Sequence, residues 1–79
     1  MEITYDSEAD ALYVQLRDDV PAHHAVDIEI GVAVDLGEDG HIIGLEILGA
    51  GKRLTPEELS RVMYRNLVSE RAAFATLPP

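Results

Sequence analysis

The sequence has no cysteine, few basic residues and no long apolar run, and each shortage excludes a class of protein. Without cysteine, the 79-residue chain forms neither a disulfide nor a zinc–thiolate site. No run approaches the ~18 apolar residues of a membrane span. We therefore expect a single domain over residues 1–79, located in the cytoplasm, with no membrane partner, no cofactor and no structural metal.

Basic residues are scarce mainly in one part of the chain. The net charge is −9. Residues 1–51 contain twelve acidic residues and one basic residue, Arg17, whereas residues 52–79 contain five basic and three acidic residues. An acidic surface repels nucleic-acid phosphates and attracts basic proteins. The charge thus predicts no unaided binding to nucleic acid and suggests a basic protein partner, although solubility alone is the plainer explanation.

Alternation of apolar and polar residues predicts an antiparallel sheet over residues 1–48, beginning with a hairpin. Residues 3–5 and 12–16 alternate with period two on either side of a polar turn. Keeping the apolar residues on one face sets the register. The expected pairs are Tyr5 with Leu12 and Ile3 with Val14.

The clearest alternation runs from Val26 to Leu36, where every even position is apolar. It predicts one long strand, with Gly31 as the place for a bend or bulge. A four-residue loop, Gly37–Gly40, then leads into a last strand that ends at Leu48. The register expected from the apolar pattern pairs Leu36 with His41, Val34 with Ile43, Val32 with Leu45 and Ile30 with Ile47.

A helix is predicted over residues 55–70. Thr55 suits the N-cap, Pro56 suits the first helical position, and Glu58 completes a capping box. The stripe expected to pack on the sheet contains Leu59, Val62, Met63 and Leu67. Residues 71–79 are expected to form a tail. The predicted fold is α+β: a four-stranded antiparallel meander of two hairpins, with one C-terminal helix packed on one face.

No motif in the sequence indicates a catalytic, metal or cofactor site. Alternate carboxylates from Asp6 to Asp10 resemble the start of a calcium loop, but the later Gly and acidic ligands are missing, so a capped turn is predicted. His23 and His24 are adjacent and point to opposite sides of an extended segment, and His41 lies at a turn. The segment Gly49–Arg53 lacks the frame of a phosphate-binding loop and is interpreted as a linker.

Several short motifs, in this order and spacing, resemble the domain of unknown function family 2283 (DUF2283) over about residues 3–50. The matching segments are Tyr5-Asp6, Asp10–Val14, Gly31, Val34-Asp35, Gly40 and Ile43–Leu48. The resemblance implies no established activity and no catalytic residues. Members are similar to small proteins encoded beside small RNA-cleaving toxins, which implies an antitoxin-like role.

Three functions remain open. The leading hypothesis is a non-enzymatic protein-interaction module, in its antitoxin-like form a partner of a small basic toxin. One alternative is a small enzyme that uses carboxylates from among Asp10, Asp35 and Glu46, although no adjacent His or second acid is visible to support it. The other is a plain structural homodimer.

A two-fold dimer is predicted to use the flank of the C-terminal helix. On a helical wheel, Tyr64 and Val68 fall outside the stripe that covers the sheet and lie one turn apart. Such a ridge is typical of a contact surface, and two-fold dimers are common. Arg61 and Arg65 flank this ridge and can reach the acidic sheet of a second copy.

Overall fold

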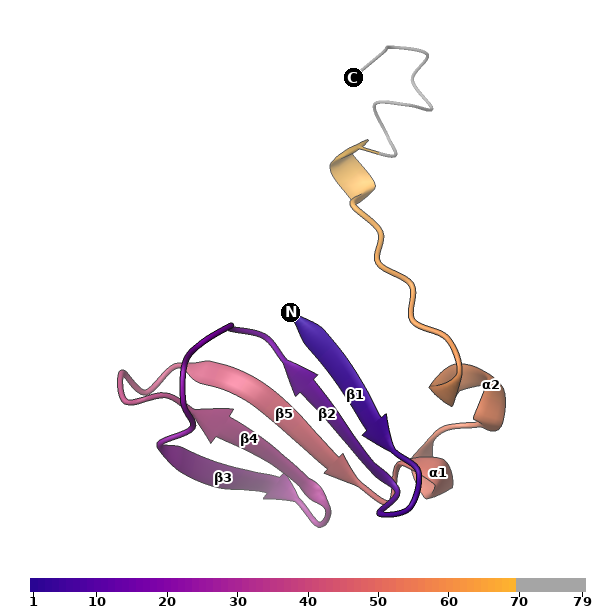
Figure 1. Ribbon diagram of the computed structural model, residues 1–79, viewed down its shortest axis with the longest axis horizontal. Helices are drawn as coiled ribbons and strands as arrows, with labels where there is room; N and C mark the ends of the chain where they lie inside the picture. The colour runs from indigo at the N-terminus through magenta and orange to yellow at the C-terminus, as the bar shows by residue number, and fades with distance from the viewer. Residues whose placement is uncertain (70–79) are drawn as a thin grey trace.

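The computed structural model describes residues 1–69, in which five antiparallel strands form one sheet followed by two short helices (Figure 1). The elements are β1 (Glu2–Asp6), β2 (Ala11–Gln15), β3 (His24–Glu29), β4 (Val32–Leu36), β5 (Ile42–Leu48), α1 (Ala50–Arg53) and α2 (Pro56–Leu59). Their order in the sheet is β1-β2-β5-β4-β3, so the last strand lies in the centre. The α+β antiparallel class is confirmed, whereas the prediction of a four-stranded meander is wrong.

The first hairpin has the predicted register. Tyr5 lies opposite Leu12, and Ile3 lies opposite Val14. In the turn, Asp6 Oδ1 accepts hydrogen bonds from the backbone N–H groups of Glu8 at 2.9 Å and Ala9 at 3.1 Å. The acidic turn is therefore built by side-chain capping of backbone amides, as its sequence indicates.

The long strand predicted from Val26 to Leu36 is wrong, because the chain reverses at Ile30 and Gly31 to form the β3–β4 hairpin. Gly31 has a φ of 82°, which only glycine adopts without strain. The register shifts between Asp27 and Glu29. Because of this shift, even-numbered residues lie opposite even-numbered residues along most of the hairpin. Alternation is consequently unbroken through the turn and cannot distinguish a hairpin from one strand.

The register predicted between the last two strands is also wrong. Val34 lies opposite Leu45 rather than Ile43, and Val32 lies opposite Ile47. The observed pairing is shifted by two residues from the predicted one. Because side chains alternate between the two faces of a strand, a shift of two residues leaves each side chain on its predicted face. The apolar pattern therefore cannot choose between these registers. A shift between Asp35 and Leu36 places Leu36 opposite Ile42 at the end of the hairpin.

The predicted helix begins as expected. Thr55 Oγ1 accepts the backbone N–H of Glu58 at 3.2 Å, and Glu58 Oε1 accepts the backbone N–H of Thr55 at 2.8 Å, which confirms the capping box. Pro56 is the first residue of α2. Helices within residues 1–69 have neither the length nor the apolar composition to cross a bilayer.

The prediction of one helix over 55–70 packed on the sheet is wrong, because α2 ends at Leu59 and residues 61–66 have no regular structure. Ser60 Oγ donates to the carbonyl oxygen of Glu57, and Asn66 Oδ1 accepts the amides of Val68 and Ser69, where a new helical turn starts. Both polar side chains compete with a continuous helix. A helix this short also depends on packing, and most of this segment lies away from the sheet (Figure 1). The predicted tail, 71–79, lies outside the described residues.

Candidate interaction faces of the sheet

One face of the sheet is apolar across all five strands. Cross-strand partners point to the same side, so the register assigns each residue to a face. One row contains Ile3, Val14, Leu45, Val34 and Val26, and the next contains Tyr5, Leu12, Ile47 and Val32. We call these nine residues the apolar face. None of the nine is charged, but Glu29, which lies opposite Val32 where β3 ends, belongs to the same side of the sheet.

The apolar face is only partly covered within residues 1–69. Ile43 and Ala50, at 3% and 0% exposure, are the buried hydrophobic residues of this part of the chain. Residues of the apolar face on the outer strands are 38–40% exposed, and those on the inner strands are half-buried. A groove of about 210 Å³ separates β1 and β2 from α2. Its lining is Ile3, Tyr5, Leu12, Val14, Leu54, Glu58, Leu59 and Val62.

The opposite face carries five carboxylates and, among its strand residues, neither Lys nor Arg. These carboxylates, which we call the acidic face, belong to Glu2, Asp6, Asp27, Asp35 and Glu46. They come from all strands except β2, so the negative charge spreads across the sheet. Five of the six acidic residues in the strands therefore lie on one face of the sheet.

Tyr13 connects three strands on the acidic face. Its hydroxyl donates to Asp35 Oδ2 at 2.8 Å, so the side chain extends from β2 across β5 to β4. It passes directly over Gly44, where a Cβ atom would overlap the hydroxyl. Burial raises the pKa of Tyr13 above its usual value, as do the bond to Asp35 and the charge of Glu46.

The carboxylates considered for catalysis are only partly brought together. Asp35 and Glu46 lie on the same face on either side of Tyr13, whereas Asp10 lies in the β1–β2 turn. Asp35 already accepts the hydroxyl of Tyr13 at 2.8 Å. The arrangement therefore serves first to tie β2 to β4.

Asp10 joins the first hairpin to α1. Its Oδ1 accepts the Tyr5 hydroxyl at 2.7 Å and the Gly51 amide at 2.8 Å, and its carbonyl oxygen accepts the Ala50 amide at 3.1 Å. The hydrogen bond from Tyr5, followed by that from Gly51, lowers the pKa of the Asp10 carboxyl. This role of Asp10 is not visible in the sequence, because the partners lie up to 41 residues apart.

We predict that Asp10 contributes to acid sensitivity. Its folded-state pKa lies below its unfolded value, so its contribution is complete above about pH 4 and is lost as pH falls through the lowered pKa. In the Asp10→Asn variant, the urea midpoint of unfolding should fall less steeply than in the wild type as the pH is lowered below about 4. Asp10 and Asp19 both have positive φ, 57° at Asp19, so Asp19→Asn is the matched control. It should keep the wild-type dependence of the midpoint on pH. An equal dependence in wild type and Asp10→Asn would contradict the assignment.

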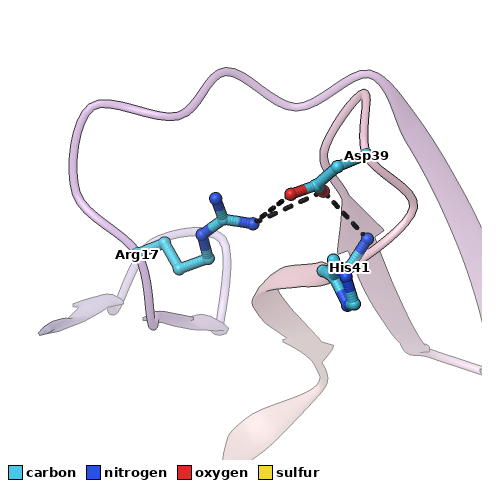
Figure 2. Close-up of polar contacts among 3 residues, drawn as sticks. All are labelled: Arg17, Asp39 and His41. Atoms are coloured by element: carbon cyan, nitrogen blue, oxygen red, sulfur yellow. Dashed lines mark hydrogen bonds and ion pairs between the residues drawn. The ribbon is translucent and has the colours of Figure 1, made fainter.

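A second polar cluster fixes the β4–β5 turn. Figure 2 shows Arg17 reaching Asp39, with Nη1 at 3.0 Å from Oδ2, while the backbone N–H of His41 donates to Oδ1 at 3.0 Å. The amide of His41 and then Arg17 lower the pKa of Asp39. The contact ties the connection between β2 and β3 to this turn. A nearby pocket of about 280 Å³ is lined by Val20, Pro21, Ala22, His23, Glu38 and Asp39.

The three histidines lie at the start of β3 and just before β5. His23 precedes β3, His24 begins it, and His41 follows the β4–β5 turn. Within residues 1–69, no group of three or more His, Cys, Asp or Glu side chains is placed to hold a metal ion.

The segment interpreted as a linker has a structural role. Residues Ala50–Arg53 form α1, and Arg53 Nη1 pairs with Glu29 Oε2 at 3.1 Å. Arg53 also donates through Nη2 to the carbonyl oxygen of Ile30. It therefore holds the β3–β4 turn and is already engaged by protein atoms.

The predicted dimer contact lies after α2. Arg61, Tyr64 and Arg65 fall in the part without regular structure, and Val68 falls in the following turn. Tyr64 and Val68 therefore do not lie one turn apart on a single helix, and the predicted helical ridge is wrong. Both side chains are exposed, and the role of these four residues in a contact stays a prediction.

The fold and its faces define a small α+β sheet domain with one apolar and one acidic side. The family model described as "Protein of unknown function (DUF2283)" matches residues 2–50, and the chain belongs to this family. The family resemblance is thus confirmed, and its match ends at the start of α1. No curated protein and no solved structure matches the chain.

Proposed function

We propose that this protein is an interaction module whose acidic face binds a basic protein. The supporting observation is the gathering of five carboxylates on one face, with no basic residue on the strands of that face. Single exposed ion pairs contribute little affinity, but a field of one sign steers an oppositely charged partner and raises its association rate.

The antitoxin-like form of the proposal names a basic RNA-cleaving enzyme as the partner, in the cytoplasm. An enzyme that holds RNA contacts phosphates with Lys and Arg side chains. Carboxylates on neighbouring strands, ~4.8 Å apart, can engage the same cations and exclude the RNA. The carboxylate-enzyme alternative has less support, because Asp10 lies in the β1–β2 turn and Asp35 already accepts the hydroxyl of Tyr13 at 2.8 Å.

The test uses a small basic RNA-cleaving protein as the probe, with association measured by stopped flow at several salt concentrations. Neutralising Glu2, Asp27 and Glu46 together, as Gln, Asn and Gln, should slow association by about 10-fold at low salt. The matched control neutralises Glu8, Glu38 and Glu57 as Gln and leaves the same net charge. It should slow association much less.

Two results would contradict the proposed function. One is an equal effect of the two triple variants, which would mean that only net charge matters. The other is binding that does not weaken as salt rises, since a contact made by opposite charges is screened.

A further inference from the structure

We propose that the apolar face is closed by the same face of a second copy, sheet against sheet, in a two-fold dimer. This inference goes beyond the proposed function, because it concerns the opposite side of the sheet. In such an isologous contact each copy contributes the same nine residues. Sheets packed in this way lie ~10 Å apart with interdigitated side chains.

Within residues 1–69, the sheet lacks a complete second layer on its apolar side. A stable domain buries the apolar side of a sheet against another layer of structure. Leu54, α2 and Val62 line the groove over β1 and β2. Val34 and Leu45, on two inner strands, stay half-buried where a covered sheet would bury them.

The apolar face has a substantial area. Five strands of about five residues give a sheet face of roughly 24 by 17 Å, or about 400 Å² before the side-chain relief is counted. The segment after α2 adds apolar side chains that are 62–79% exposed, and a tyrosine such as Tyr64 alone buries about 150 Å² or more. Most of this segment lies away from the sheet (Figure 1), so the face itself is the main contribution, about half of the ~800 Å² per partner of a standard interface before side-chain relief is counted. The apolar residues of this segment are Val62, Met63, Tyr64, Leu67 and Val68.

The distribution of charge also favours the apolar face as the contact between two copies. A protein of net charge −9 repels its own copy through most of its surface. The apolar face is the exception, since its nine residues are uncharged and its acidic counterpart points away from the contact. At the corner of the sheet, Glu29 follows the register shift and pairs with Arg53 at 3.1 Å. The Glu29 carboxylate thus has a cationic partner, and Glu58, which lines the groove, accepts the backbone N–H of Thr55 at 2.8 Å.

The dimer replaces the predicted contact with a larger one. The four residues Arg61, Tyr64, Arg65 and Val68 were expected to form the interface as a helix flank, and in the proposed dimer their segment lies at its border. Because the contact is apolar and the long-range charge is repulsive, the dimer should hold or tighten as salt rises. Binding of a basic partner to the acidic face should weaken under the same conditions, so the two proposals fail separately.

The test is the mass of the full chain by sedimentation equilibrium between about 1 and 100 μM. We expect twice 8.6 kDa for the wild type. Val34→Glu places two carboxylates in the apolar contact and should weaken the dimer at least about 100-fold. Its neighbour Ala33 lies on the other face, so Ala33→Glu should leave the dimer intact.

A second pair of variants covers the case in which Val34→Glu does not fold, which circular dichroism reports. Val26 is 40% exposed on the outer strand β3, so Val26→Glu is tolerated by a monomer and should still break the dimer. Ala25→Glu is its control on the other face. A monomeric wild type at ~100 μM, a dimer lost as salt rises, or equal effects of Val26→Glu and Ala25→Glu would overturn the proposal. The last result would indicate pairing along the β3 edge.

Discussion

Gly44→Ala is expected to lower the free energy of unfolding by about 3 kcal/mol, since it combines overpacking with a lost charge-assisted hydrogen bond. A Cβ at this position overlaps the Tyr13 hydroxyl. The ring must move off the centre of the sheet, and its 2.8 Å bond to Asp35 must break. Two strands that are not neighbours, β2 and β4, then lose their direct connection. Urea unfolding at fixed protein concentration measures the loss.

The Tyr13→Ser background provides the control. With the ring removed, the new methyl group meets no obstacle, and alanine in place of glycine in a strand is favourable by roughly 0.5–1 kcal/mol. The effect of Gly44→Ala should therefore change sign between the two backgrounds, which a double-mutant cycle detects. A similar loss in both backgrounds would mean that Tyr13 is not the cause.

The two faces of the sheet could be predicted from the sequence. Alternation places Val26, Val32 and Val34 on one side and Asp27 and Asp35 on the other, and the structure keeps this division. The division depends only on whether a position is odd or even, which is a local property. It is also the property from which both proposed interaction surfaces follow.

The number of strands and one register could not be predicted, for related reasons. The β3–β4 turn and its shift preserve the odd–even pattern, so alternation continues through a chain reversal at Ile30 and Gly31. A two-residue slip between β4 and β5 preserves it as well. The burial of apolar residues determines which face of a strand points to the apolar side. It does not distinguish between registers that keep the same residues on that face. The first hairpin was predicted correctly because its polar turn is short and its apolar residues are few.

The polar contacts were beyond sequence reasoning because their partners are distant in the chain. Tyr13 and Asp35 are 22 residues apart, and Asp10 and Gly51 are 41 residues apart. Nothing periodic connects such pairs. The prediction of the helix was wrong for a different reason. Its start depends on local capping and was predicted correctly. Its length depends on packing against another surface, and residues 61–66 do not form a helix packed in this way.

Gly31→Val is expected to lower the free energy of unfolding by about 3 kcal/mol, through a left-handed backbone that L-residues adopt at a cost and through crowding. Gly31 has a φ of 82°. An added Cβ would lie 3.1 Å from Arg53 Nη2 and 3.4 Å from the Leu48 carbonyl oxygen. Arg53 cannot simply swing away, because it pairs with Glu29 at 3.1 Å and also donates to Ile30. The Gly31→Ala variant should lose about 2 kcal/mol for the same two reasons.

Gly40→Ala separates the two causes. Gly40 has nearly the same φ, 81°, but a Cβ there meets no atom within 4 Å, so this variant reports the backbone cost alone, about 1 kcal/mol. The additional loss in Gly31→Ala reports the contact with Arg53 and should shrink in an Arg53→Ala background. If Gly31→Val instead leaves the unfolding midpoint unchanged, no turn requires glycine at this position. Cross-strand NMR contacts between Asp27 and Ala33 in the variant would show whether the β3–β4 hairpin is kept.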